Sequence, residues 1–256
     1  MCKPTYFDVS YEINPWMNVK RRPESGNVEE QWNALYGLMK QFAPKLCLID
    51  PQVGLPDMVF SANGALVRGK RAVVASFRYP ERQMEALHYQ KWLEDHGYVV
   101  SKLREGYFEG EGDALMAGDH LIAGWGFRSG PEVFEKVAAI LDVDHLTVCE
   151  MVDPRFYHLD TCFAPLNATE AIFYPGAFTA LAVQDLEKVI TLIEVDEDEA
   201  CRFACNQVVV GEHILIPSGC PKIGKRLEDR GFQVHPVQLD EFLKAGGAAK
   251  CMVLKV

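Results

Sequence analysis

Four stretches of the chain repeat one pattern, in which two short apolar runs flank a polar turn. They span Ala65–Ala75, Ala114–Ala123, Phe163–Phe173 and Val208–Ile216, at intervals of roughly 45 residues. Three of the turns, at 69–71, 118–120 and 211–213, hold a glycine followed by two polar residues, and 167–170 supplies the fourth turn. This pattern predicts four β-hairpins with short loops.

A helical pattern and a further apolar run follow each hairpin. Apolar residues at helical spacing predict helices over Glu81–His96, Gly130–Leu141, Ala177–Val189 and Pro221–Gly231. The strands predicted after these helices are Tyr98–Leu103, His145–Val152, Thr191–Val195 and Phe232–Leu239. Each unit therefore contains strand, strand, helix and strand, in this order.

The two ends of the chain hold the parts of a fifth unit. A helix is predicted over Trp32–Phe42 and a strand over Leu46–Asp50, while Lys250–Val256 predicts a C-terminal strand with no helix after it. Repeats of this length stack or close in a ring, and the complementary ends favour a ring. Because no Ser- or Gly-rich linker interrupts the chain, residues 1–256 are predicted to form a single α/β domain.

Composition narrows the class of protein. The formal charge of −10 argues against nucleic acid or an anionic membrane as a partner, and it mildly favours a cationic small molecule. No run of eighteen apolar residues and no signal-like start are present, so we expect a cytoplasmic protein.

The eight cysteines are spread irregularly, mostly inside apolar stretches, which indicates reduced thiols rather than a disulfide framework. Cys201, Cys205, His213 and Cys220 lie in the order of a metal site, but their spacing is not that of a common structural zinc site. We expect no metal.

Two segments hold residue types suited to proton transfer and nucleophilic attack. In the first, the small-residue loop that begins at Gly246 delivers Cys251 to the predicted C-terminal strand, although this cysteine could also be a buried core thiol. In the second, His158 and Asp160 are two apart in a segment predicted to be extended, so both would face the same side. They could move protons beside a thiolate or form a structural hydrogen bond.

Carboxylates and an amide stand before the first two hairpins. Glu109, Glu111 and Asp113 lie with two glycines inside six residues, without the ligand spacing of a helix–loop–helix calcium site. Carboxylates at this density match the five donors of a buried guanidinium. Asn63 ends a predicted apolar strand before the first hairpin, where it could also be a turn residue.

Taken together, these segments resemble the guanidino-group-modifying enzymes, the superfamily of arginine deiminases, dimethylargininases and amidinotransferases. The resemblance covers nearly the whole chain, since Ile13–Met17 and Phe77–Arg82 also look like the arginine dihydrolase subgroup. It implies a five-bladed, pseudo-symmetric α/β propeller, the pentein fold. It also implies a hydrolase of arginine metabolism that needs no cofactor and acts on an arginine-like substrate, and it leaves open a homo-oligomer.

The resemblance implies roles for three catalytic residues. Cys251 would attack the guanidinium carbon and form a covalent thiouronium. His158 would protonate the leaving nitrogen and then deprotonate the water that releases the product. Glu109 would support His158.

The resemblance also implies five substrate-binding residues. Asp160 would grip the guanidinium, Asp113 would line the substrate cradle, and Arg78 and Asn14 would hold the substrate carboxylate. Asn63 replaces the Asp of arginine deiminases, as in the arginine dihydrolases. Because an amide can donate to a ureido oxygen, citrulline could react a second time and give ornithine, carbon dioxide and ammonia.

Glu111 departs from the family, whose members usually have a small residue there. We interpret its side chain as facing solvent, with a more basic substrate such as agmatine as the alternative. A deiminase and a dimethylargininase remain alternatives. An amidinotransferase also remains one, because no motif reports whether water or an amine attacks the thiouronium. A ribosome-binding propeller protein shares the fold, but the acidic charge and the joint presence of Cys251 and His158 oppose it.

Overall fold

Four three-stranded sheets of one design make up most of the computed structural model, which describes residues 1–256. Their strands are β1 (Ala65–Arg68), β2 (Arg71–Val74), β3 (Val99–Ser101), β4 (Ala114–Ala117), β5 (His120–Trp125), β6 (His145–Glu150), β7 (Phe163–Pro165), β8 (Glu170–Phe173), β9 (Thr191–Glu194), β10 (Val208–Val210), β11 (His213–Pro217) and β12 (Gln233–Val237). In each sheet the first two strands form an antiparallel hairpin and the third pairs parallel to the second. All four predicted hairpins are confirmed.

A helical crossover joins the second and third strands of every sheet, as a parallel pair requires. The helices are α2 (Pro80–Gln83), α3 (Glu85–Asp95), α4 (Phe134–Leu141), α5 (Ala180–Glu187) and α7 (Pro221–Glu228). These elements confirm the predicted order of strand, strand, helix and strand. The first predicted helix is divided in two at Met84.

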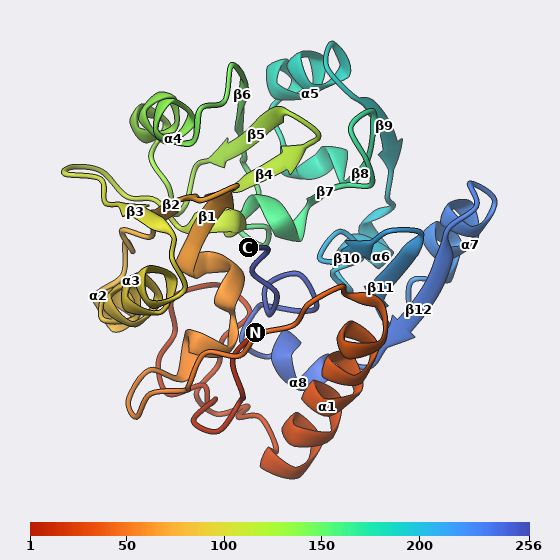
Figure 1. Ribbon diagram of the computed structural model, residues 1–256. Coiled ribbons are helices and arrows are strands. Elements are labelled where there is room, and N and C mark those ends of the chain that lie inside the picture. Colours follow the sequence, from red (N-terminus) through yellow and green to blue (C-terminus); the bar gives the residue numbers. More distant parts are fainter.

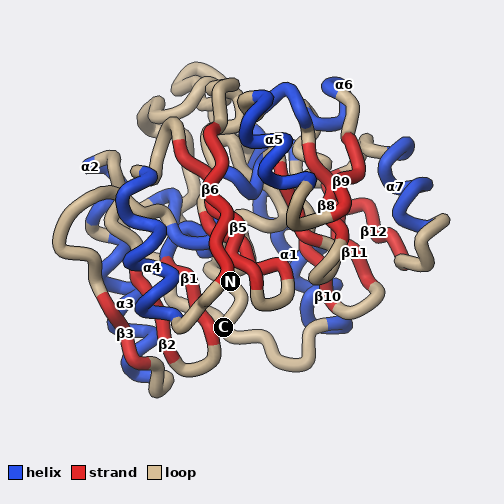
Figure 2. The backbone as a smooth tube through the Cα atoms, turned by 90° about the horizontal axis from the view of Figure 1, so that it is seen from above, coloured by secondary structure: helices blue, strands red, loops and turns tan.

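The sheets lie around a common centre, with the crossover helices α3, α4, α5 and α7 toward the outside (Figure 1). Seen at right angles, the helices flank the strands (Figure 2). The apolar core continues between neighbouring sheets, because a single cluster of buried residues includes Ile122 of β5, Phe163 of β7, Ile172 of β8 and Ile214 of β11. No helix is both long and apolar enough to cross a membrane.

The chain ends differ from the prediction. Helix α1 (Ser25–Phe42) begins seven residues earlier than predicted, and the predicted strand Leu46–Asp50 is reduced to one bridge between Ile49 and Cys2. The predicted strand Lys250–Val256 is wrong. Residues 249–252 form a turn, closed by a hydrogen bond from the Val253 amide to the Lys250 carbonyl (3.0 Å), and the last residues pair with no strand. The remaining short helices are α6 (Glu197–Ala200) and α8 (Asp240–Leu243).

Tight helical turns stand before three of the hairpins, two of them where a strand ending at Asn63 and an extended segment at His158 and Asp160 were predicted. They are the 3-10 turns Ser61–Gly64, Gly110–Gly112 and Leu159–Thr161. In the third, both the amide and the hydroxyl of Thr161 donate to the carbonyl of His158, which curls the chain back on itself. These turns carry Asn63, Glu111 and Asp160, so they bring polar side chains to the entrance of each hairpin.

Candidate active site

Cys251 lies in the turn that replaces the predicted C-terminal strand, and its thiol is buried. The Sγ is 3.3 Å from Oδ2 of Asp160 and 3.1 Å from Nδ2 of Asn206. The Asn206 side chain also accepts from the backbone amides of Ala248 (3.1 Å) and Cys251 (3.2 Å). Asn206 therefore holds both the loop and the sulfur in place.

Burial and a neighbouring carboxylate keep this cysteine as a thiol. Burial raises the pKa of Cys251 well above its usual value, and Asp160 raises it further. Burial also raises the pKa of Asp160 to about 7, against the lowering effect of Lys250. A thiolate here requires a positive charge beside it, and a bound guanidinium cation would supply one.

His158 pairs with Glu109, and Asp160 faces the cysteine instead. The Nε2 of His158 is 2.8 Å from Oε2 of Glu109, which also accepts from Nη1 of Arg128 at 2.9 Å. Burial alone would raise the pKa of Glu109, but Arg128 and His158 together hold it well below the usual range. An ionised Glu109 only accepts, so Nε2 carries a hydrogen and Nδ1 is the nitrogen free to exchange a proton.

Asp113 accepts hydrogen bonds from two backbone amides and one hydroxyl. Its Oδ2 accepts from the amide (3.0 Å) and the hydroxyl (2.6 Å) of Ser129, and its Oδ1 accepts from the amide of Leu159 at 3.2 Å. Burial raises its pKa to about 6, opposed by His158 and Ser129. Both oxygens are thus occupied, and Asp113 fixes the residue that follows His158.

Asn63 is buried with its amide held in one orientation. Its Oδ1 accepts from Nη1 of Arg82 at 2.8 Å, while its Nδ2 has no partner. Arg82 is itself fixed by two hydrogen bonds to Glu85, at 2.9 and 2.8 Å. A free N–H donor therefore points away from Arg82.

Gly112 lies against both Asn63 and His158. A Cβ added to it would be 2.3 Å from the Asn63 Nδ2 and 3.2 Å from the His158 ring. We expect Gly112→Ala to lower kcat/KM by about 10²-fold, since displacing reacting groups by about 1 Å has an effect of this size. Gly37→Ala is the matched control, because nothing lies within 4 Å of that position in α1. Equal activity of the two variants would contradict the contact.

Arg78 and Asn14 lie at the edge of this cluster. The Arg78 side chain is exposed, with its guanidinium 5.7 Å from the centre of the Tyr107 ring, and only its backbone amide reaches Glu109 (3.1 Å). The Asn14 side chain donates to the carbonyl of Ala245 (3.0 Å), next to the glycine loop. The buried guanidinium groups of this region belong to Arg82 and Arg128.

Sequence reasoning missed Arg128, which is 2% exposed and lies between the rings of Tyr79 and Tyr157 (4.7 and 4.6 Å). Its Nη2 donates to the carbonyl of Ile13. One signal was available, since a Phe-Arg pair follows both β2 and β5, at 77–78 and 127–128. Arg82, Lys250 and Asn206 had no comparable signal.

The prediction that Glu111 faces solvent is wrong. Its side chain is buried, and Oε2 accepts from the Nζ of Lys250 at 2.8 Å and the amide of Lys255 at 3.0 Å. Sequence reasoning could not find this pair because its members are 139 residues apart.

Four buried polar atoms around the cluster have no partner: Asp57 Oδ1, Asn63 Nδ2, His158 Nδ1 and Asp160 Oδ1. A buried polar atom without a partner is unfavourable unless a ligand or water satisfies it. Two carboxylate oxygens and one imidazole nitrogen as acceptors suit a planar, many-donor cation.

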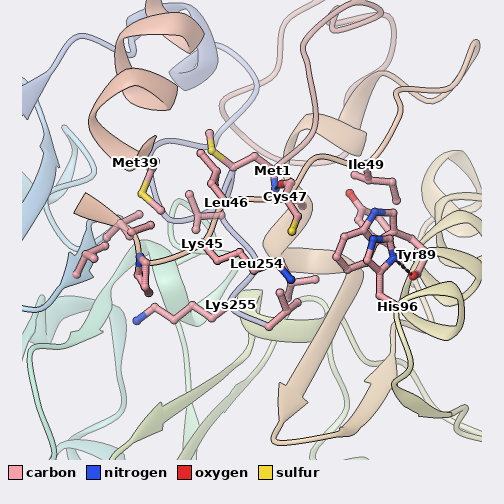
Figure 3. Close-up of a pocket in the computed structure, with 18 of the residues that line it drawn as sticks. Met1, Met39, Lys45, Leu46, Cys47, Ile49, Tyr89, His96, Leu254 and Lys255 are labelled. Carbon is pink, nitrogen blue, oxygen red and sulfur yellow. Dashed lines mark hydrogen bonds between the residues drawn. The ribbon is translucent and has the colours of Figure 1, made fainter. Parts of the chain in front are cut away.

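A separate cavity of about 410 Å³ lies elsewhere, between α1, α3 and the last residues of the chain. Figure 3 shows Met1, Met39, Cys47, Tyr89 and Leu254 around it, and most of its lining is apolar. Neither Cys251 nor His158 lines this cavity, so the cavity is not part of the candidate active site.

Residues 11–256 match the family model described as N,N dimethylarginine dimethylhydrolase, eukaryotic. The N(G),N(G)-dimethylarginine dimethylaminohydrolase of Mycobacterium tuberculosis is 37% identical over all of this chain and 84% of its own length. The chain belongs to this family. The resemblance to guanidino-group-modifying enzymes is thereby confirmed.

Two further relatives are arginine dihydrolases. The bifunctional arginine dihydrolase/ornithine cyclodeaminase AgrE of Nostoc is 42% identical over all of this chain, which spans 37% of the length of AgrE. A crystal structure of the N-terminal domain of ArgZ, a cyanobacterial arginine dihydrolase, bound to substrate has a TM-score of 0.94 at 40% identity, covering 98% of this chain and 95% of that domain. The arginine dihydrolase-like subgroup is confirmed as well.

Proposed function

We propose that this protein is an arginine dihydrolase, which converts arginine to ornithine, carbon dioxide and two molecules of ammonia. The observation that carries the proposal is the orientation of Asn63, whose Oδ1 is held by Arg82 so that the free Nδ2 can donate to a ligand. A carboxylate at this position would repel the oxygen of a neutral ureido group, whereas the amide donates to it. The similarity to AgrE and ArgZ supports the same reaction.

We further propose that residues 1–256 form one catalytic domain with the architecture of a five-bladed propeller. The four sheets would be four blades, and α1, the bridge at Ile49 and the C-terminal turn would form the fifth. This arrangement is supported by the hydrogen bond from the Ala62 amide to the Cys251 carbonyl (2.9 Å), which joins the first hairpin to the chain end.

In the proposed complex, the guanidinium lies between the free oxygen of Asp160 and the Nδ1 of His158, beside Cys251. The substrate carboxylate lies at the other end, near Asn14. We assign the carboxylate contact to Arg128 in preference to the exposed Arg78, because Arg128 is buried and bonds to the residue before Asn14. Several of its N–H groups remain available for a carboxylate.

The first round uses Cys251 as nucleophile and His158 as acid and base. The cation lowers the pKa of the thiol, whose proton passes to His158 as the sulfur bonds to the guanidinium carbon. His158 gives this proton to the departing nitrogen, and ammonia leaves a thiouronium. His158 then takes a proton from water, the hydroxide adds to the carbon, and the C–S bond breaks to give citrulline and the thiol. The proton left over converts ammonia to ammonium.

The second round repeats the attack on citrulline. The sulfur adds to the ureido carbon while Asn63 donates to the ureido oxygen, and ammonia leaves a thiocarbamate. Water then releases a carbamate of ornithine, which loses carbon dioxide. One arginine and two waters thus give ornithine, carbon dioxide and two ammonia molecules.

Product analysis tests this proposal. We expect the protein to form ornithine and ammonia in a ratio of one to two, with no accumulation of citrulline. Asn63→Asp should release citrulline. The hydrolysis of citrulline should slow by about 10²-fold or more in this variant, because the amide that donates to the ureido oxygen is lost. Ornithine would be measured by chromatography and ammonia by a coupled assay.

Other outcomes would identify a different enzyme of the family. Citrulline as the sole product of the unmodified protein would indicate a deiminase. Dimethylamine from dimethylarginine with arginine inert would indicate a dimethylargininase. A guanidino product formed only when glycine is added would indicate an amidinotransferase.

A further inference from the structure

A buried ion pair connects the turn at 249–252, which carries Cys251, to the 3-10 turn Gly110–Gly112. The Nζ of Lys250 is 2.8 Å from Oε2 of Glu111, and their side chains are 8% and 7% exposed. Lys250 also donates to the carbonyl of Val253 (3.1 Å), and the same Glu111 oxygen accepts from the amide of Lys255 (3.0 Å). Glu111 therefore contacts the chain both before Cys251, at Lys250, and after it, at Lys255.

Glu111 lies on the same turn as the glycine that supports His158. Its neighbour Gly112 leaves so little space that an added Cβ would meet both Asn63 and the His158 ring. The backbone of Lys250 is held in addition by the carbonyl of Asn206 (3.1 Å). The ion pair is thus a direct side-chain connection between the segment that carries Cys251 and the turn against which His158 packs.

The same pair acts electrostatically on Asp160. The Cys251 thiol and the Asn206 amide form hydrogen bonds with this carboxyl, and the charges of Lys250 and Glu111 act on it. Burial has the largest effect and raises the pKa of Asp160, Lys250 lowers this pKa, and Glu111 raises it in the same direction as burial. The two members of the pair therefore shift the ionisation of Asp160 in opposite directions.

We propose that Lys250 and Glu111 are positioning residues, which hold the Cys251 turn against the His158 turn and set the charge that Asp160 presents to a guanidinium. This inference rests on the proposed hydrolysis of arginine by the same site. A buried pair of this kind is costly to desolvate, so stability alone does not account for it.

The test is the pH dependence of kcat/KM, which reports the ionisation of the free enzyme. Lys250→Met should move the acidic limb to higher pH by about half a unit or more, because Asp160 loses the cation that favours its ionised form. Glu111→Gln should move the limb to lower pH. The double variant should return it toward the wild-type position, and Lys250→Arg should leave it unchanged.

The matched control is Lys222→Met, which removes the exposed partner of Asp196 and should shift nothing. A purely structural role for the pair predicts lower kcat in both single variants without opposite shifts of the limb. Shifts of Lys250→Met and Glu111→Gln in the same direction, or none in either, would overturn the electrostatic part of the proposal.

Hydrogen exchange tests the positioning part without any need for activity. The amides of residues 249–253 should exchange at least about tenfold faster in Lys250→Met and in Glu111→Gln than in the wild type or Lys222→Met, because the turn loses its anchor. Unchanged exchange would overturn this part. If the unmodified protein does not hydrolyse arginine, the proposed function fails while the exchange result still decides the positioning role.

Discussion

Replacing Cys251 with alanine is expected to lower the rate of arginine hydrolysis by at least about 10³-fold, since a covalent mechanism loses its nucleophile. The Sγ of Cys251 is the sulfur that contacts both Asp160 and Asn206. Arginine should still bind, because the other groups of the site remain in place. Ornithine formation measures the rate, and isothermal titration measures binding.

Cys47→Ala is the matched control for this substitution. Cys47 is partly buried beside the apolar cavity and makes no contact with the site, so its variant should keep the wild-type rate. Hydrolysis that survives Cys251→Ala would contradict covalent catalysis.

Replacing Arg128 with methionine is expected to destabilise the fold by about 3 kcal/mol or more, since removing one partner of a buried ion pair leaves the other charge uncompensated. Arg128 and Glu109 are 2% and 0% exposed, and the guanidinium also packs between two tyrosine rings. The methionine variant should in addition raise KM for arginine, because the proposed carboxylate contact is lost. Urea unfolding and steady-state kinetics measure the two effects.

Arg155→Met provides the comparison for stability. Arg155 pairs with Asp153 and Glu197, but its side chain is 39% exposed, and surface pairs contribute about 1 kcal/mol at most. Equal losses in Arg128→Met and Arg155→Met would contradict the assignment of Arg128 to a buried pair. A large loss of stability with KM unchanged would contradict only its contact with substrate.

The repeated units could be predicted because they depend on local patterns. Two apolar runs around a short polar turn predicted each hairpin, and helical spacing predicted each crossover. The ends of the chain could not be predicted in this way. Lys250–Val256 has the apolar content of a strand, but its backbone groups bond to Asn206, to Glu111 and within a turn, and these partners are distant in sequence.

The sequence indicated candidate site residues but not the hydrogen bonds that they form. His158 and Asp160 were expected to face one side of an extended segment, and the 3-10 turn at 159–161 directs them to different partners. His158 bonds to Glu109, while Asp160 bonds to Cys251. A resemblance to a family can indicate which residues matter, whereas the hydrogen-bond geometry decides which pairs they form.

Buried charges were the least predictable part of the site. Arg128, Arg82 and Lys250 are charged residues that composition alone would place at the surface. Each is buried because a carboxylate lies within 2.9 Å of it, and only for Arg82 is that carboxylate close in sequence, at Glu85. The resemblance assigned the substrate carboxylate to Arg78, which is exposed, whereas the proposed complex assigns it to the buried Arg128.

The most direct test of the proposed mechanism is acid quenching of the protein during turnover of isotopically labelled arginine, followed by mass spectrometry of its peptides. We expect the label as a covalent adduct on the peptide that contains Cys251, with labelled ornithine as the end product. An adduct on another cysteine, or steady turnover with no adduct and full activity of Cys251→Ala, would contradict the proposal.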